Sequence, residues 1–342
     1  MSKAAELAAL IGSQTALSNR NLIINGAMQV WQRGTTTDTI TTGNYLCDRW
    51  RIAHNGTDGN VDVDQSTDVP SGQGFGYSQK ISMDASETSL DAGDQVNIQQ
   101  RFEGQNLQLL EKGSSSAKKV TLSFWVKSSV AATYSINLVD NDNTRIIGAT
   151  YVVNSANTWE KKTITFDGDT SGTLDNDANR SLDLRFWLDT GTTYTSGTFA
   201  TSWGASSDAV SASATTGWLE STSPEFYITG IQLEVGEQDT PFEHRSYGDE
   251  LRRCQRYYQE ETLSWRLGVE GSRNTQLPFP HKVSMRAAPT STLTGGTVTN
   301  CTMLGTTNVS SETTNFHFWL GASGSLQNGV CTNWTFKADA EL

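Results

Sequence analysis

The stretch VTLSFWVK, residues 120–127, decides the fold, because the character of its side chains alternates from one residue to the next. Apolar residues occupy every second position from Val120 to Val126, and polar residues together with Trp125 fill the positions between them. Successive side chains of a β-strand point to opposite faces of its sheet. The alternation therefore predicts a strand with one buried face and one face in water.

The same two-residue rhythm recurs through the central third of the chain. One register holds Leu182, Leu184, Phe186 and Leu188, a second holds Ile164 and Phe166, and a third holds Ile136 and Leu138. Clusters of Asn, Asp, Ser and Gly, which favour turns, separate these segments. Amphipathic strands of this kind form antiparallel sheets, and two sheets can bury their apolar faces against each other. We therefore predict an all-β fold, an antiparallel β-sandwich of the jelly-roll type.

The length of 342 residues exceeds the size at which one hydrophobic core usually stops growing, so we expect two folded units and a short terminal element. A strand at 226–235 shifts its alternation at Gly230, which indicates a β-bulge. Residues 247–258 have the spacing of a helical turn or two. Beyond about residue 256 a second, small β domain is predicted, with strands at 263–269, 281–285, 297–304, 315–320 and 331–337.

Residues 3–11, KAAELAALI, have apolar side chains at helical spacing, among them Leu7, Ala8 and Ile11. A helix this short is marginally stable alone, because nucleation is costly. Two interpretations stay open. The helix either joins other copies of the chain or a larger assembly, or it is a frayed terminus or lies on its own domain.

The charge balance argues against a nucleic-acid partner. The chain carries 25 Lys and Arg against 37 Asp and Glu, a formal net charge of -12, which repels a phosphate backbone. No stretch approaches the roughly 18 consecutive apolar residues of a membrane helix, so we expect no membrane insertion. The N-terminus lacks the plan of a signal peptide, which indicates synthesis in a cytoplasm.

No catalytic motif is found. The histidines, at 54, 244, 281 and 317, are isolated from one another. Most carboxylates lie in turn-forming contexts, although their number leaves a glycosidase pair open. No cofactor is predicted. The acidic runs 140–143, DNDN, and 167–169, DGD, could supply oxygen ligands to a calcium ion, but the spacing of an EF-hand is absent.

The most suggestive side chains are aromatic. Trp125 and Trp187 fall opposite the apolar stripe of their strands, and Trp159 shares the outer register of its own strand. An indole can cover the apolar face of a sugar ring while polar neighbours bind the hydroxyl groups. The long loop at 190–218 adds two more indoles, and loops of this length are often functional. The candidate glycan-binding residues are Trp125, Lys127, Trp159, Asp183, Arg185, Trp187, Trp203 and Trp218.

The alternative is that a loop, the C-terminal segment or another subunit covers these indoles. Trp125 and Trp187 also need not lie on the same sheet.

Three segments carry a resemblance to a known family. Residues 21–50 read NLIINGAMQVWQRGTTTDTITTGNYLCDRW, residues 228–258 read ITGIQLEVGEQDTPFEHRSYGDELRRCQRYY, and residues 338–342 read ADAEL. In these segments the chain resembles bacteriophage virion proteins that are tail-fibre-like and receptor-binding, in which NLIING leads into a β-sandwich.

The resemblance implies a homotrimer in the virion, assembled in the host cytoplasm. It implies that residues 1–18, with Leu7, Ala8 and Ile11, attach to other phage virion proteins. Residues 19–255 would form a sandwich similar to a carbohydrate-binding module, which contacts bacterial surface polysaccharide, and residues 256–342 a tip or inter-subunit domain. Because no long shaft is present, a short appendage, fibre knob or adaptor fits better than a long tail fibre.

Three functions from different classes follow. The first, which we expect, is a non-enzymatic virion appendage whose weak affinity for a surface glycan is multiplied by symmetric copies. The second is a purely structural adaptor or decoration protein of the virion. The third is a short glycan hydrolase.

Overall fold

The computed structural model describes residues 19–37, 43–56, 59–87, 89–211, 216–269, 274–299, 302–303, 310–311, 313–321 and 327–342. The chain divides into two compact units, Met1–Ser246 and Tyr247–Leu342. The predicted N-terminal helix, with Leu7, Ala8 and Ile11, lies outside the described residues. Within the described ranges, no helix is long and apolar enough to span a membrane.

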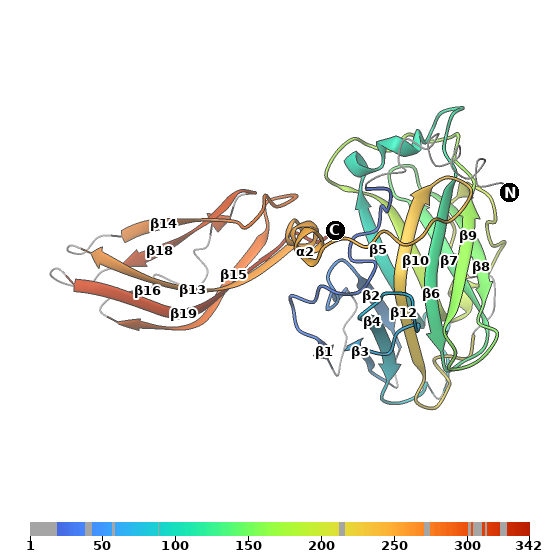
Figure 1. Cartoon of the computed structure of the whole chain (residues 1–342), viewed down its shortest axis with the longest axis horizontal. Coiled ribbons are helices and arrows are strands. Elements are labelled where there is room, and N and C mark those ends of the chain that lie inside the picture. Colours follow the sequence, from blue (N-terminus) through green and yellow to red (C-terminus); the bar gives the residue numbers. More distant parts are fainter. Residues whose placement is uncertain are drawn as a thin grey trace. The chain divides into compact units, whose positions relative to one another are not determined.

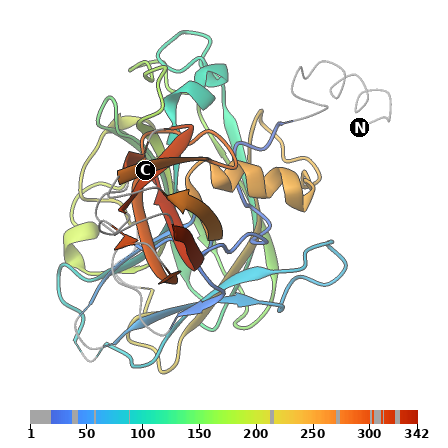
Figure 2. The same cartoon turned by 90° about the vertical axis from the view of Figure 1, so that its left-hand side faces the viewer.

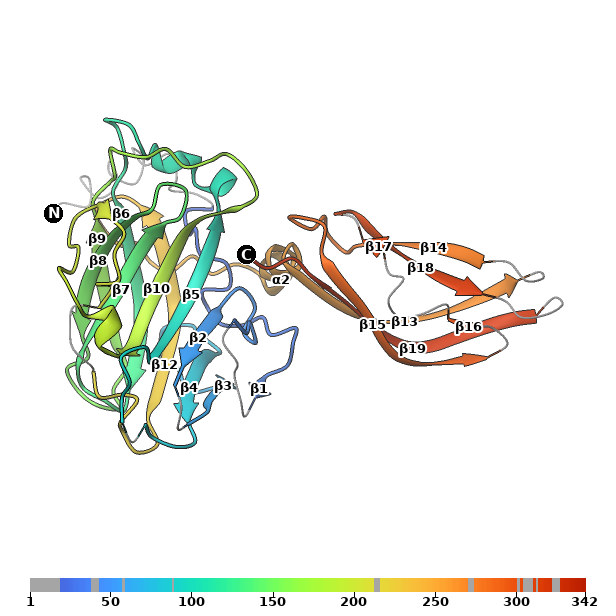
Figure 3. The same cartoon turned by 180° about the vertical axis from the view of Figure 1, so that it is seen from behind.

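Two antiparallel sheets of six strands each build the first unit (Figures 1 and 3). In spatial order, the β6 sheet consists of β1 (Thr36–Thr37), β3 (Val61–Ser66), β4 (Ser78–Met83), β12 (Glu225–Val235), β6 (Val120–Ser128) and β9 (Glu160–Phe166). The β10 sheet consists of β11 (Gly204–Ala205), β8 (Arg145–Val152), β7 (Thr133–Asp140), β10 (Arg180–Thr190), β5 (Gln95–Glu103) and β2 (Arg51–Asn55). Three short 3-10 helices lie in the connections: η1 (Gly104–Asn106), η2 (Gln108–Leu110) and η3 (Thr192–Tyr194).

The apolar registers of the two sheets face each other and form the core. The ring of Phe124 on β6 lies 5.1 Å from that of Phe186 on β10 and 5.1 Å from that of Tyr151 on β8. The chain crosses between the sheets repeatedly, for example from β5 to β6 and on to β7, as in a jelly roll. These contacts confirm the predicted all-β antiparallel sandwich.

The predicted bulge in β12 is confirmed at Gly230. The pairing of β12 with β6 shifts register between Thr229 and Gln232. Gly230 itself has φ +62°, a left-handed conformation that favours glycine. A Cβ atom at this position would lie 2.5 Å from the ring of Phe75, so glycine is needed both for backbone conformation and for close approach.

Asn25 organises the irregular segment that precedes β2. Its backbone is left-handed, with φ 58°, and its side-chain oxygen accepts hydrogen bonds from the amides of Gln29 at 2.9 Å and Val30 at 3.0 Å. Its side-chain nitrogen donates to the carbonyl of Asp48 at 3.0 Å, and the indole of Trp50 donates to the Asn25 carbonyl at 3.0 Å. The residues of the 21–50 segment therefore have a structural role in fixing this part of the chain.

The second unit combines one helix with two small sheets. The helix is α2 (Tyr247–Gln255), drawn in orange in Figure 2, and it confirms the helical turns predicted there. One sheet orders β13 (Tyr258–Val269), β19 (Gln327–Asp339) and β15 (Thr290–Thr299), and the other orders β14 (Asn274–Pro280), β18 (Asn315–Gly321) and β16 (Thr302–Met303), with β17 (Ser310–Ser311) also paired to β18.

The division of the chain falls before α2, whereas we placed it after residue 255. The helix runs directly into β13, and Gln259 on that strand donates from its side-chain nitrogen to the carbonyl of Gln255 at 3.0 Å. The strand predicted at 281–285 is wrong, because this segment is irregular. The strand β14 was missed, since it contains Pro278 and Pro280, which cannot donate to a ladder and are tolerated on an edge strand.

Candidate ligand-binding site

A pocket of about 430 Å³ lies on the outer face of the β10 sheet. Its floor comes from β2, β5, β10 and β7, and its walls come from the β7–β8 turn and the loop between β10 and β12. Ligand sites in proteins typically have volumes of about 300–1,000 Å³. The pocket therefore has room for a small ligand or for one part of a polymer.

A row of polar side chains crosses the floor from strand to strand. Arg51 on β2 pairs in register with Gln99 on β5, Gln99 pairs with Arg185 on β10, and Arg185 pairs with Asn137 on β7. These residues share the face opposite the core because they alternate with buried apolar residues such as Ile98. The period-two pattern thus places guanidinium and amide groups side by side.

Asp183, two residues before Arg185 on β10, accepts hydrogen bonds from two arginines. Arg180 donates from Nε to Oδ1 of Asp183 at 2.7 Å and also contacts the second oxygen, and Arg185 donates from Nη2 to Oδ2 at 2.7 Å. The Asp183 side chain is 0% exposed. Burial raises its pKa, but the hydrogen bonds and charges of Arg180 and Arg185 outweigh that effect and hold the pKa below its ordinary value. Asp183 therefore stays ionised and orients both guanidinium groups.

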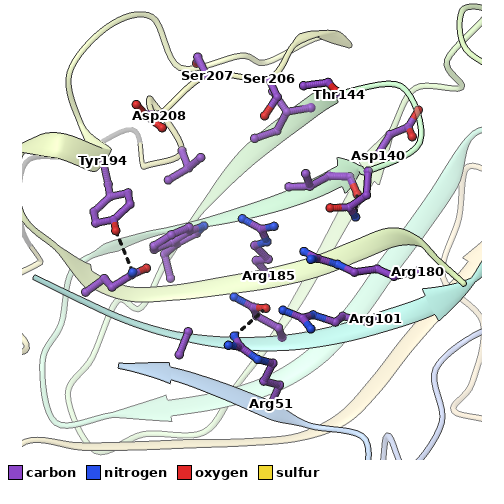
Figure 4. Close-up of a pocket in the computed structure, with 18 residues that line it drawn as sticks. Arg51, Arg101, Asp140, Thr144, Arg180, Arg185, Tyr194, Ser206, Ser207 and Asp208 are labelled. Atoms are coloured by element: carbon purple, nitrogen blue, oxygen red, sulfur yellow. Dashed lines mark hydrogen bonds between the residues drawn. The ribbon is translucent and has the colours of Figure 1, made fainter. Parts of the chain in front are cut away.

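Arg51 lies at the edge of the arginine group. Its Nη1 donates to the side-chain oxygen of Gln99 at 3.3 Å (Figure 4). Burial lowers the pKa of Arg51, and the like charges of Arg180 and Arg185 add to this effect, against the opposing influence of Tyr45 and Asp183. The guanidinium groups on the floor are thus close enough to repel one another.

The loop between β10 and β12 forms the opposite wall. Tyr194 lies with its ring 5.5 Å from that of Trp187, and its hydroxyl accepts a hydrogen bond from Gln95 at 2.8 Å. The Val210 amide donates to the carbonyl of Tyr194 at 3.0 Å, and β11 pairs with β8, which together hold the loop against the sheet. Further along, Ser206, Ser207 and Asp208 face the arginines (Figure 4).

This arrangement suits a polar ligand with at least one anionic oxygen. Arginine presents a planar set of donors that matches a carboxylate or phosphate group. The hydroxyl and carboxylate groups of the opposite wall can bind sugar hydroxyls. Trp187 and Tyr194 close one end with aromatic surface.

The structure splits the predicted glycan-binding residues between two surfaces. Trp187, Arg185 and Asp183 belong to β10, and the first two line the pocket, whereas Asp183 contacts the lining residues Arg180 and Arg185. Trp125 and Lys127 belong to β6, on the other sheet. Because the core separates the outer faces of the two sheets, these residues cannot form one site.

The β6 sheet has a lysine-aromatic cluster of its own, formed by Lys127, Trp159, Tyr227 and Asp68. The Lys127 ammonium lies 4.0 Å from the ring centre of Tyr227 and 5.9 Å from that of Trp159. Asp68 accepts a hydrogen bond from the Trp159 indole at 2.8 Å and forms an ion pair with Lys127. The polar groups of Lys127 and Trp159 are therefore already bound within the protein. Trp125, also on this surface, is half-buried.

Three further expectations need correction. Trp218 is 0% exposed and belongs to the main core, so it cannot contact a ligand. Trp203 packs on that core, donates to the carbonyl of Asp167 at 2.7 Å and lies 5.2 Å from the Lys112 ammonium. Trp187 faces outward as predicted, but the loop covers it to 3% exposure.

The two acidic runs considered for calcium converge on a lysine. The Lys112 ammonium forms ion pairs with Asp140 and, at 3.0 Å, with Asp169, and it donates to the carbonyls of Ser171 at 3.1 Å and Gly172 at 2.8 Å. A protein cation thus occupies the centre of this oxygen cluster. In the described residues, no group of three or more His, Cys, Asp or Glu side chains could hold a metal ion.

Sequence reasoning missed several pocket residues: Arg51, Arg101, Arg180, Tyr194 and Asp208. For Arg101 a signal existed. Residues 95–103 alternate between the buried Val96, Ile98 and Phe102 and the polar series that ends at Arg101. Tyr194 and Asp208 lie in a loop without periodicity, where no pattern could have found them.

No protein-family model matches the sequence, and no curated protein sequence matches it. Solved structures show weak likeness. The enzymatically active domain of tailspike protein 4 from bacteriophage CBA120 is 15% identical with a TM-score of 0.33, and the match covers 58% of this chain and 21% of that chain, well under two thirds of its length.

A structure described as CBM4 is 14% identical with a TM-score of 0.31, covering 62% of this chain and 98% of that one. The family 11 carbohydrate-binding module from Clostridium thermocellum is 14% identical with a TM-score of 0.29, covering 62% and 99%. Similarities at this level do not decide the function.

Proposed function

We propose that this chain is a non-enzymatic bacteriophage virion appendage whose pocket on the β10 sheet binds a bacterial surface polysaccharide. One observation carries the proposal: outward-facing guanidinium and amide groups line a pocket of about 430 Å³ that also has aromatic residues and hydroxyl groups. Saccharides are bound by this combination of donors, acceptors and aromatic surface.

The virion part of the proposal rests on the resemblance of the segments 21–50, 228–258 and 338–342 to tail-fibre-like virion proteins. It includes a homotrimer, attachment to other virion proteins through residues 1–18, and a place in the virion. Three copies would multiply a weak single-site affinity when they engage one bacterial surface.

The state of the nearby carboxylates supports binding over hydrolysis. A glycosidase needs one carboxyl group with a raised pKa to donate a proton. The pKa of Asp183 is held low by its two arginine partners despite burial, and Asp140 contacts Lys112 and Asn143. Both carboxylates serve the structure, so we assign neither a role in bond cleavage.

The experiment places a large side chain in the pocket by a substitution at an exposed residue and leaves the core residues unchanged. Ser207 is exposed and lines the pocket, so Ser207→Trp places an indole in the ligand volume. Ser115, also exposed, lies outside the pocket residues, and Ser115→Trp is the matched control. Binding of the purified full chain to polysaccharides extracted from bacterial surfaces is measured by affinity electrophoresis.

We expect the unaltered chain and Ser115→Trp to bind one of these polysaccharides equally, and Ser207→Trp to lose most of that binding. Equal binding by both variants would place the glycan elsewhere on the protein. A chain that binds none of a broad polysaccharide panel would favour the purely structural role. Release of reducing ends would indicate a hydrolase.

A further inference from the structure

The charge at the pocket is opposite to that of the whole chain. The formal net charge is -12, yet the pocket lining includes Arg51, Arg101, Arg180 and Arg185. Of the lining carboxylates, Asp140 is bound to Lys112, which leaves Asp208 on the opposite wall. Asp183, paired with Arg180 and Arg185, offsets part of the positive charge. The ion pairs of Asp183 therefore serve Arg180 and Arg185, and Arg51 adds a further positive charge to the floor.

Some guanidinium groups of the floor have N–H donors that do not contact Asp183. Arg180 and Arg185 each use Nε and Nη2 for Asp183, and in the described chain neither donates a hydrogen bond from Nη1. Arg51 donates only to the neutral amide of Gln99 and has no ion pair within the described ranges. An anion bound here would receive charge-assisted hydrogen bonds from groups that the protein has already oriented.

We propose that the pocket selects a glycan carrying an oxyanion substituent, a carboxylate or a phosphate, which Arg51 and Arg185 bind on the floor. This inference rests on the proposed function and names the substrate class of the same site. The anion accepts hydrogen bonds from the arginines, and the attached sugar directs hydroxyl groups to Ser206, Ser207 and Asp208.

The negative surface limits which polyanions are bound. Nucleic acids and homopolymers with a charge on every unit are repelled by the rest of the chain, whereas a single anion in the pocket is bound at close range. Fields from exposed charges are screened over about 8 Å at physiological salt. Acidic groups farther than this from the protein are therefore little affected by its net charge, and the group inside the pocket decides the selection.

The test compares one polysaccharide in three forms: native, carboxyl-reduced and treated with hydrofluoric acid to remove phosphate. The polysaccharide is the one that binds the chain best in a panel of acidic and neutral bacterial polymers. The proteins are the unaltered full chain, Arg51→Gln and Lys161→Gln. Lys161 is an exposed cation on β9, paired with Asp239, so its substitution makes the same change in net charge outside the pocket.

We expect that removing either the carboxylate or the phosphate groups from the polysaccharide weakens its binding by about 10-fold or more, both for the unaltered chain and for Lys161→Gln. This is the factor that a charge-assisted hydrogen bond contributes. Arg51→Gln should bind the native polysaccharide by the same factor more weakly than the unaltered chain does. It should also bind the native and treated polysaccharides with equal affinity. Sensitivity to carboxyl reduction identifies a carboxylate, and sensitivity to hydrofluoric acid a phosphate.

Three outcomes overturn the inference. If all three forms bind equally, or if Arg51→Gln discriminates as well as the unaltered chain, the pocket does not select an anion, although the proposed glycan binding stands. If no polymer of the panel binds, both proposals fall. Thermal unfolding of Arg51→Gln beside the unaltered chain shows whether the variant is folded. Arg185→Lys, which retains the positive charge, is a second variant at the pocket.

Discussion

The guanidinium group of Arg245 donates a hydrogen bond to the carbonyl oxygen of Ile23 at 2.9 Å, although 222 residues separate the two in the sequence. Arg245 also donates to the carbonyl of Asn21, and Glu243 accepts the Asn21 amide at 2.8 Å. The segments 21–50 and 228–258 are therefore bound to each other. Arg245 and Glu243 thus hold the start and the end of the sandwich together.

We predict that Arg245→Met destabilises the first unit by about 2 kcal/mol, because it removes charge-assisted hydrogen bonds to partly buried carbonyls. The Arg245 side chain is only 8% exposed, so water cannot fully replace it. Denaturant unfolding measures the change. Arg252→Met, at a site 73% exposed on α2, is the control and should alter stability by less than about 0.5 kcal/mol. Equal midpoints for the two variants would contradict the prediction.

Replacing Lys112 by Met should destabilise the first unit by about 3–5 kcal/mol, the range measured when one partner of a buried ion pair is removed. The side chains of Lys112, Asp140 and Asp169 are 5%, 0% and 2% exposed. Without Lys112, Asp140 would lose its ion-pair partner in a buried place, whereas Asp169 would keep Arg145. Calorimetry gives the shift in Tm. Lys118→Met, at a position 43% exposed, controls for lost charge. A Lys112→Met protein as stable as the control would show that the cluster is dispensable.

Gly230→Ala should cost about 2 kcal/mol or more, since it combines a left-handed backbone with overpacking against Phe75. Gly236, with φ +134°, has no atom within 4 Å of the position that a Cβ would take. Gly236→Ala therefore adds backbone strain without overpacking, and comparison with Gly230→Ala separates these two effects. Adding Phe75→Ala to each variant completes a double-mutant cycle. No coupling between positions 75 and 230 would rule out the steric explanation.

Stability should fall in acid because Asp169 and Asp183 have pKa values below the ordinary range in the folded state. For Asp169, burial raises the pKa, but hydrogen bonds from Arg145 and Lys112 outweigh it. Carboxyl groups of this kind stabilise the fold above their unfolded pKa, near about 3.9, and this contribution is lost as pH falls through the folded pKa. Denaturant titrations from pH 6 to pH 2, values chosen to span about two units on each side of that point, measure the loss.

Asp183→Asn should flatten this acid limb, since its side chain cannot titrate. An unchanged slope would show that Asp183 contributes nothing to the pH dependence.

Tyr194→Ala should weaken glycan binding by about 3-fold to 10-fold, the factor for loss of an aromatic contact. Trp159→Ala should leave the affinity unchanged, because Trp159 packs on Tyr227 and donates to Asp68. Binding of both variants to the same polysaccharide distinguishes the pocket from the lysine-aromatic cluster. The reverse order of effects would move the site to the β6 sheet.

The alternation of apolar and polar side chains predicts the sandwich well, because a strand with one buried face has this pattern within its own few residues. The register of Val120 and Phe124 in the core and of Arg185 on the outer face follows directly from it. Alternation does not specify which strands share a sheet, so Trp125 and Trp187 could not be separated beforehand. It also does not show what covers an outward side chain, and the loop over Trp187 depends on contacts such as that of Val210 with Tyr194.

The lysine cluster shows a further limit of sequence reasoning. The sequence indicates that the runs 140–143 and 167–169 could supply oxygen ligands to calcium, but in the structure Asp140 and Asp169 form ion pairs with Lys112. Lys112, however, lies in an irregular segment with no spacing relation to either run. Such a contact depends on tertiary structure alone.

The pocket combines a rigid floor with a wall of different origin. Arg51, Gln99 and Arg185 are held by the hydrogen-bond ladder of the β10 sheet, whereas Tyr194 and Asp208 come from one connection between β10 and β12. The pocket-lining residues Ser206, Ser207 and Asp208 of that connection can be exchanged without disturbing the interior, whereas Trp218 and Leu219 of the same connection belong to the core. The side chains on the wall can therefore change while the strand pairing of β2, β5 and β10 keeps the arginines of the floor in place.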